Sequence, residues 1–436
     1  MSSLTVGFVG IAVALILIAI RFPIGIALGA TSLIGIAMIR GPVASYAMLR
    51  DEPFTTAAHF SLSAIPMFIL MGAFANFGGL SAGLFRAARS WLSFLPGSLA
   101  IASNMACAGF SAASGSSLAT TAAIGRIAIP EMLAAGYNKG LASGSVAAGG
   151  TLGVMIPPSL VFIIYGIFAE VSISDLFIAG IIPGLLTLIV YCLMIGLRCH
   201  FNPALAPRSD LSESWRDRWR SLGQVWPIIC LVIAVIGAIY AGIATPTEAG
   251  ALGAFCAIVI SALNGRLSRS MFSDSLHETV TTTARVFFIV IGAVLFSRFM
   301  AQAGVAPYLA QLIVDNDPSP WTIIFMAAAL FLLLGMFLDT LGLLLLTLPL
   351  LIPMFEAANL DLIWLGVLTV KFVEIGMITP PVGLNVYVLK SIVGEKIRLE
   401  TIFSGAAWFI LCEVFICAAL IAFPSLSLFL VNTMHN

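Results

Sequence analysis

Long apolar stretches separated by short polar segments dominate this sequence. A helix needs about 20 apolar residues to cross the hydrocarbon core of a bilayer, and ten stretches are close to that length or longer. They cover residues 4–20, 22–39, 54–77, 140–168, 176–197, 225–243, 248–263, 280–301, 362–389 and 403–431. Two of them, 140–168 and 362–389, contain a Pro-Pro pair. Because proline lacks a backbone donor and clashes with the preceding turn, we predict that both are broken helices.

Two further apolar stretches, 96–133 and 321–355, are interrupted near the middle. The first is interrupted by the run Ser-Ala-Ala-Ser-Gly-Ser-Ser at 111–117 and the second by Asp-Thr-Leu-Gly at 339–342. We predict that each is a re-entrant hairpin, which enters the membrane, turns and leaves on the same side.

Composition supports a membrane protein. Of 436 residues, 60% are hydrophobic and only 40 are charged, 20 basic plus 20 acidic, whereas soluble chains carry about 25% charge. The net charge of zero provides no field that attracts polyanions, so nucleic acid is not an expected partner. The apolar runs are too long and too uniform to be barrel strands. The predicted fold class is therefore an all-α polytopic membrane protein surrounded by lipid.

The distribution of basic residues predicts an orientation. Arg208, Arg216, Arg218 and Arg220 lie in the polar linker 200–224, which the positive-inside rule places in the cytoplasm. Alternation then puts both chain ends outside. The base of the first hairpin is flanked by basic residues and that of the second by acidic ones, so we expect the hairpins to approach the midplane from opposite sides. The segment 84–95 is expected to be an amphipathic interfacial helix.

The two halves of the chain resemble each other in order. Segments 68–73, 153–158 and 176–180 match 288–293, 376–381 and 402–406 at shifts of 220, 223 and 226, and the last shift superposes Ser114 on Thr340. We therefore divide the chain into repeat 1 (1–199), the linker 200–224 and repeat 2 (225–436). Each repeat contains five crossings plus one hairpin, and an odd number of crossings forces the second copy to be inverted. Inverted repeats with broken helices are typical of secondary transporters.

The broken segments are the candidate ion sites. Unwound backbone survives at membrane depth only where it is buried in protein or lines a polar cavity, and hard cations prefer oxygen ligands. Each candidate shell combines a hairpin tip with a Pro-Pro break, and its oxygens come from side chains or main chain. The first shell comprises Ser114, Ser116, Gly150, Gly153, Val154 and Pro157, and the second comprises Asp339, Thr340, Gly342, Thr379 and Pro380. The alternative is that the small residues serve close helix packing and the prolines are kinks.

Other polar residues carry weaker signals. Tip amides at half-helix N-termini favour an anionic substrate, and we consider Ser117, Asn385 and Arg298 as substrate contacts. Arg298 lies at the end of its span, which favours an interfacial anchor over a substrate contact. Lys371 and Glu374 lie one turn apart, which favours a structural ion pair over a coupling site.

Five segments together resemble a known family, the large membrane subunit of tripartite ATP-independent periplasmic (TRAP) transporters. They are 66–72, 109–117, 153–159, 242–249 and 378–385. The resemblance implies an elevator mechanism, in which a scaffold holds a mobile domain made of the hairpins and broken helices. It also implies two or more Na⁺ sites, a separate small four-helix membrane subunit, a periplasmic substrate-binding protein and a bacterial inner-membrane location. The first tip is built from serine and glycine whereas the second carries Asp339, so the two ion shells differ chemically.

The sequence has no GxxxxGK[ST] loop, so an ion gradient rather than ATP is the expected energy source. We therefore predict sodium-driven uptake of an organic acid, with C4-dicarboxylates, sialic acid and other sugar acids all open as substrates. One alternative is a stand-alone Na⁺/dicarboxylate symporter of related fold. An intramembrane hydrolase is the other, but the sequence offers neither a GxSG motif with a membrane-depth histidine nor two intramembrane aspartates.

Overall fold

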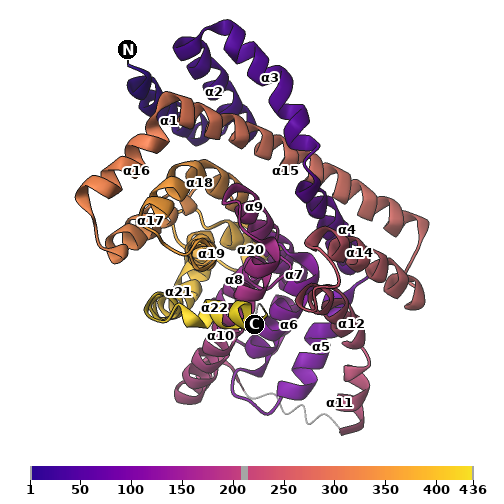
Figure 1. The fold of residues 1–436 in the computed structure, drawn as a ribbon. Coiled ribbons are helices and arrows are strands. Elements are labelled where there is room, and N and C mark those ends of the chain that lie inside the picture. Colours follow the sequence, from indigo (N-terminus) through magenta and orange to yellow (C-terminus); the bar gives the residue numbers. More distant parts are fainter. Residues whose placement is uncertain (1, 208–214, 435–436) are drawn as a thin grey trace.

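The computed structural model describes residues 2–207 and 215–434, and every regular element in these ranges is helical (Figure 1). The first half contains α1 (Ser3–Ala19), α2 (Ile24–Arg40), α3 (Pro42–Ala57), η1 (Phe60–Ser63), α4 (Ala64–Phe77), α5 (Leu80–Leu92), α6 (Ser98–Ser114), α7 (Ser117–Ala134), α8 (Lys139–Met155), α9 (Leu160–Phe168), α10 (Ile173–Phe201) and η2 (Pro203–Leu205). The second half contains α11 (Trp215–Leu222), α12 (Trp226–Val232), η3 (Ile233–Gly237), α13 (Ala238–Tyr240), α14 (Pro246–Leu263), α15 (Arg269–Ala303), α16 (Val305–Asn316), α17 (Pro320–Gly335), α18 (Thr340–Ala357), α19 (Leu362–Ile378), α20 (Leu384–Val393), η4 (Gly394–Lys396), α21 (Leu399–Ala422) and α22 (Ser425–Met434).

All ten predicted crossings coincide with helices, which confirms the all-α polytopic fold class. Within the described ranges, seven helices are long and apolar enough to span a bilayer, or eight when α8 and α9 are counted as one bent span. The helices α1 and α2 have 17 residues each, one fewer than the 18 that a span requires here. The helix α18 is one of the seven, although the sequence analysis assigns it to a hairpin. The number of ten crossings therefore stays a prediction.

Several predicted boundaries were wrong. The stretch 54–77 is two helices, because α3 ends at Ala57 and the chain restarts as η1 and α4. The last crossing also ends early: α21 stops at Ala422 and Pro424 separates it from α22, since proline cannot continue the hydrogen-bonding pattern. The helix α16, which follows Gly304, was not predicted at all.

The polar linker is partly helical. Its α11 packs against α5, and the ring of Trp91 meets Trp215 and Trp219 edge to face. Residues 208–214, including the predicted cytoplasmic Arg208, lie outside the described residues. The predicted amphipathic helix at 84–95 is α5, which begins four residues earlier and buries Leu84 and Phe85.

Two pairs of corresponding helices in the two halves have equal lengths. The helices α7 and α18 both have 18 residues and start 340 − 117 = 223 positions apart, and α8 and α19 both have 17 residues and start 362 − 139 = 223 positions apart. The same offset relates the residues that cap the second arm of each hairpin, Ser116 and Asp339. The equivalence of Ser114 with Thr340 predicted above was therefore wrong by three residues, because the shift of 226 holds only from α10 and α21 onward.

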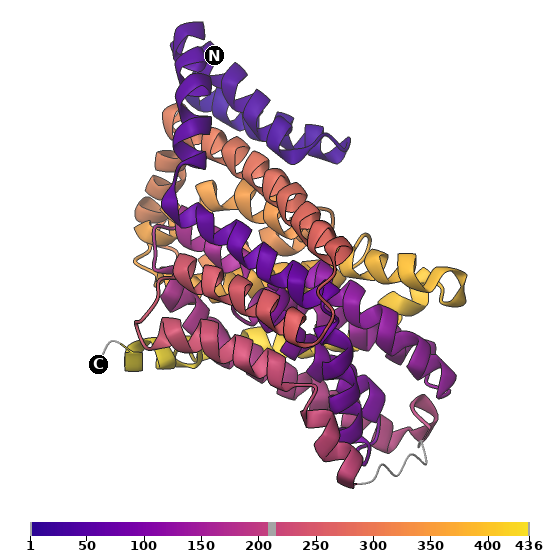
Figure 2. The same ribbon diagram turned by 90° about the vertical axis from the view of Figure 1, so that its right-hand side faces the viewer.

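The long helix α15 separates two groups of helices in Figure 1. It contacts α2, α3 and α4 of the first repeat and also α18 of the second hairpin. The broken helices α8–α9 and α19–α20 lie with the hairpins near the centre of the molecule, and Figure 2 shows α10 and the chain end on the side away from α1. This arrangement brings the two hairpin tips to one side of α15.

Candidate functional site

The first hairpin turns within two residues. Gly115 ends α6 with φ 58°, a left-handed conformation that glycine adopts without strain. Ser116 then begins α7, and its Oγ accepts a hydrogen bond from the amide of Ala119 at 3.4 Å. Ser114 is buried, and its hydroxyl lies 2.8 Å from that of Thr120. The tip therefore ends at the N-terminus of α7.

This tip lies directly on the first Pro-Pro break. A Cβ added at Gly153 would lie 2.6 Å from the carbonyl oxygen of Ser116, and one added at Gly115 would lie 2.8 Å from that of Pro158. The amide of Leu160 also points to the carbonyl of Gly115 at 3.5 Å. The small residues therefore do provide close packing, and that packing places the tip backbone beside the break.

The second hairpin has the same construction with different chemistry. Asp339 caps α18 and accepts a hydrogen bond from the amide of Gly342 at 3.3 Å. Thr340 donates its hydroxyl hydrogen to the sulfur of Met377 at 3.0 Å, just before the second break. A Cβ added at Gly335 would lie 3.2 Å from the Cα of Gly376. Tip and break are therefore adjacent in this half as well.

Both Pro-Pro pairs end a helix. The helix α8 stops at Met155 and α19 stops at Ile378, and the peptides Pro157–Pro158 and Pro380–Pro381 are cis. Because proline has no N–H, the carbonyls of Gly153 and Val154 lose the donor four residues later. Thr379 caps α19, and its hydroxyl donates to the carbonyl of Ile375 at 2.6 Å.

One cavity of about 290 Å³ is lined by both tips. The lining residues include Gly115, Ser116, Ser117, Val154, Leu160, Thr282, Arg285, Ile289, Asp339, Thr340 and Met377. The hairpins of the two repeats, both broken helices and α15 therefore meet at a single site.

The residues around Gly150 fit a small cation. Gly150 is buried in α8, and a Cβ at this position would overlap the hydroxyl of Thr121. That hydroxyl is itself buried and has no hydrogen-bond partner among the described residues. A buried unpaired oxygen is costly unless an ion or water meets it. No pattern in the sequence singles out Thr121. It is identified only by its position on α7, where it faces α8.

The three predicted substrate contacts are placed differently from one another. Ser117 lines the cavity and is hydrogen-bonded to Asn385, whose Nδ2 lies 2.7 Å from the Ser117 hydroxyl. Asn385 is fully buried and also donates to the carbonyl of Ala147 at 3.1 Å. Arg298 is not among the described lining residues and instead pairs with Glu52 of α3 at 2.7 Å. Arg285, which the sequence analysis did not select, does line the cavity.

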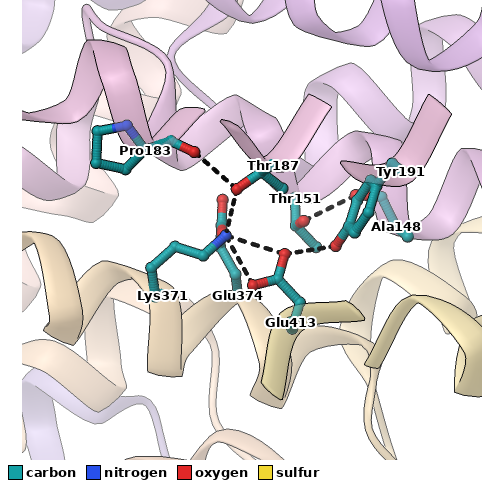
Figure 3. A network of polar contacts seen from close by, with 8 residues as sticks. All are labelled: Ala148, Thr151, Pro183, Thr187, Tyr191, Lys371, Glu374 and Glu413. Atoms are coloured by element: carbon teal, nitrogen blue, oxygen red, sulfur yellow. Dashed lines mark hydrogen bonds and ion pairs between the residues drawn. The ribbon is translucent and has the colours of Figure 1, made fainter. Parts of the chain in front are cut away.

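A second polar cluster lies outside the cavity and joins three helices (Figure 3). The ammonium of Lys371 on α19 pairs with Glu374 of the same helix and with Glu413 of α21, and it donates to the hydroxyl of Thr187 on α10 at 3.0 Å. Tyr191 donates to Glu413 at 2.6 Å. Lys371 and both glutamates are fully buried. The predicted Lys371–Glu374 pair is therefore present, as part of a larger network.

Comparison with known proteins agrees with this arrangement. Residues 11–426 match the family model described as tripartite ATP-independent periplasmic transporter, DctM component. A C4-dicarboxylate TRAP transporter large permease from Pseudomonas aeruginosa is 36% identical, over 87% of this chain and 88% of the relative. A sialic acid TRAP transporter large permease from Vibrio cholerae is 34% identical, over 85% of this chain and 86% of the relative.

A solved structure supports the fold independently of sequence. MtrF from Neisseria gonorrhoeae, from a class of antimetabolite efflux pumps, aligns with a TM-score of 0.61 over 88% of this chain and 85% of that chain, at 14% identity. The sequence relatives are transport permeases and not enzymes, which also disposes of the hydrolase alternative. The chain therefore belongs to the DctM family, the large permease component of tripartite ATP-independent periplasmic transporters.

Proposed function

We propose that this permease takes up a carboxylate anion across the bacterial inner membrane, driven by the Na⁺ gradient. The observation that carries the proposal is the single cavity between the two hairpin tips. It combines hydroxyls, unpaired carbonyls and one carboxylate for cations with helix N-termini for an anion.

Two chemically different Na⁺ shells are proposed. The ligands of the first shell are the hydroxyls of Ser114 and Ser116 and the carbonyls around Gly150, Gly153 and Val154. We add the hydroxyl of Thr121, which has no hydrogen-bond partner among the described residues. The second uses Asp339, Thr340, Gly342 and the carbonyls before Pro380. These ligands are hydroxyl, carbonyl and carboxylate oxygens with a single formal negative charge, which suit a hard monovalent cation.

The proposed stoichiometry follows from charge. Moving one net positive charge inward gains about 2.3 kcal/mol per 100 mV. A monoanionic substrate therefore needs at least two Na⁺ ions before the membrane potential assists its uptake. Two repeat-related shells provide that number for a monoanion such as a sialic acid, whereas a dicarboxylate dianion would need a third Na⁺ ion for the same assistance.

An elevator movement is the proposed mechanism. The first hairpin and the second broken helix are joined across the repeats by the Ser117–Asn385 contact, and the Lys371 network joins α19 to α10 and α21. Such links favour movement of these elements as one body. The helix α15 packs on α2, α3 and α4, so it belongs with the scaffold against which that body slides. Inverted orientation of the two repeats provides equivalent inward and outward positions.

The partners and substrate class are proposed from the family. The word tripartite in the family description implies two further components, which we propose to be a small four-helix membrane subunit and a periplasmic substrate-binding protein. The substrate is proposed to be a C4-dicarboxylate or a sialic acid, the two classes that the relatives' names contain.

Reconstitution in proteoliposomes with the small subunit and binding protein tests the proposal. Labelled succinate and N-acetylneuraminate are supplied outside, with an inward Na⁺ gradient or with K⁺ replacing Na⁺. We expect uptake of one acid that needs both Na⁺ and the binding protein. Uptake that is equal in K⁺ would overturn sodium coupling. Uptake that is equal without the binding protein would favour the stand-alone symporter.

A further inference from the structure

One charged side chain in the cavity has no role in either proposed cation shell. Among the described lining residues, the charged ones are Asp339 at the second tip and Arg285 on α15. Asp339 already caps α18. Arg285 takes part in no ion pair within residues 2–207 and 215–434, in contrast to Arg298 on the same helix.

The position of Arg285 makes this free charge unusual. It lies five residues inside the apolar stretch 280–301 of the 35-residue helix α15, and its side chain is exposed. An arginine within an apolar stretch is costly in lipid and normally faces a cavity or a partner.

Three neighbours of Arg285 on α15 line the same cavity, which shows that this side of the helix faces the hairpin tips. Thr282, Val286 and Ile289 line the same cavity as Arg285. Their spacings of three, one and four residues from Arg285 place all four on one side of a helix. Arg285 therefore belongs to the wall that α15 contributes, together with one hydroxyl-bearing neighbour.

We infer that Arg285 binds the carboxylate of the transported anion. The inference rests on the proposed function, and it names a recognition residue that belongs to the scaffold rather than to the hairpins. A guanidinium offers two parallel N–H donors that match the two oxygens of a carboxylate. Because α15 stays outside the body that carries the tips, the anion is held between a fixed cation and the moving cation shells. The permease itself then selects for an acidic group, in addition to any selection by a binding protein.

The competing explanation is that Arg285 only balances the charge of Asp339. In that case Arg285→Lys, which keeps the charge, binds the acid as tightly as the wild type. Under our inference Arg285→Lys binds the acid more weakly, because the planar pair of N–H donors is absent.

Ligand-induced thermal stabilisation tests the inference on the full-length permease purified with its accompanying subunits. The probes are succinate, N-acetylneuraminate and the neutral analogue succinamide, each titrated in Na⁺ buffer. We expect the wild type to be stabilised by one of the acids and not by succinamide. Arg285→Gln should raise the apparent Kd for that acid roughly 10- to 100-fold, as the loss of a charge-assisted contact predicts. Arg285→Lys, which keeps the charge, should give a smaller increase.

Arg298→Gln is the matched control, because this residue lies on the same helix but pairs with Glu52. Its Kd should equal that of the wild type. Unchanged affinity in Arg285→Gln would overturn the inference and leave the proposed function standing, and so would wild-type affinity in Arg285→Lys. If neither acid stabilises the wild type or enters its proteoliposomes, the proposed function fails, and this inference fails with it.

Discussion

Thr187 and Glu413 occupy equivalent positions in the two halves of the chain, and both contact the ammonium group of Lys371. They are separated by 413 − 187 = 226 residues, the same offset as the starts of α10 and α21. The hydroxyl of Thr187 lies 3.0 Å from the Lys371 nitrogen and Oε2 of Glu413 lies 2.8 Å from it. At the position that corresponds to Lys371 itself, 371 − 223 = 148, the first half has Ala148, which Figure 3 places beside the network. The lysine therefore joins the repeats from a position where they differ.

Lys371→Met should destabilise the protein strongly. The substitution keeps the side-chain length but leaves Glu374 and Glu413 buried without a cation, and breaking a buried ion pair in this way costs about 3–5 kcal/mol. The change is measured as a fall in the free energy of unfolding, or in the melting temperature, of the detergent-solubilised protein.

Replacing Lys371, Glu374 and Glu413 together by apolar residues of similar size is the control for this prediction. It should recover most of the lost stability, since no unpaired charge remains. A single Lys371→Met variant as stable as the wild type would contradict the assignment of a structural role to the network.

Asn385→Ala should cost about 1–3 kcal/mol of stability, because it removes the donors to the Ser117 hydroxyl and the Ala147 carbonyl. Ser117→Ala should cost less, since Asn385 keeps its bond to Ala147. Both residues were predicted to touch substrate, and Asn385 is fully buried. Comparing unfolding with the KM for uptake separates these roles. A KM that rises in Asn385→Ala without loss of stability would identify a direct substrate contact.

Asp339→Ser should separate the capping role of this residue from its charge. Serine caps the equivalent helix of the first hairpin at Ser116, and serine and aspartate are comparable N-caps. Stability should therefore change by less than about 0.5 kcal/mol. Sodium-dependent uptake should fall at least about tenfold, because the only carboxylate of the proposed second shell is lost. Wild-type sodium dependence in this variant would remove Asp339 from the ion site.

Thr121→Val should weaken the response to Na⁺ while preserving or increasing stability. Valine keeps the shape of threonine but removes a buried hydroxyl that has no hydrogen-bond partner among the described residues, and such a group is costly to bury. Uptake measured over a range of Na⁺ concentrations should show a higher half-saturating concentration. If the variant is more stable and its Na⁺ dependence does not change, the hydroxyl is not a ligand.

Much of this architecture was predictable from the sequence, because hydrophobic length, Pro-Pro pairs and interrupted apolar runs have direct structural meaning. The hairpins and both breaks fall where those signals lie. The register between the tips was wrong by three residues, since the shift of 226 that holds for α10 and α21 was applied to the tips, where the shift is 223. Only the observed caps, Ser116 and Asp339, fix it.

The side of α15 that lines the cavity could not be predicted from the sequence in the same way. Arg285 and Arg298 both lie in the apolar stretch 280–301, and periodicity does not reveal which one faces the tips. Depth gives no signal either, because Arg285 lies five residues inside one end of that stretch and Arg298 lies three residues inside the other. The pairing of Arg298 with Glu52 depends on the long-range contact of α15 with α3, which no local pattern encodes.

Gly153→Ala should disrupt the first ion site by moving the hairpin tip. The added Cβ would lie 2.6 Å from the Ser116 carbonyl oxygen and 2.8 Å from the Ser117 nitrogen. These are backbone atoms, so no rotamer change relieves the clash, and overpacking of this kind costs about 1–3 kcal/mol. We expect reduced stability together with weaker Na⁺-dependent uptake. Gly196→Ala in α10 is the matched control, because its new Cβ has no neighbour closer than 4.0 Å and alanine is favoured in a helix interior. Equal uptake and equal melting temperature in the two variants would show that the tip does not depend on close contact with α8.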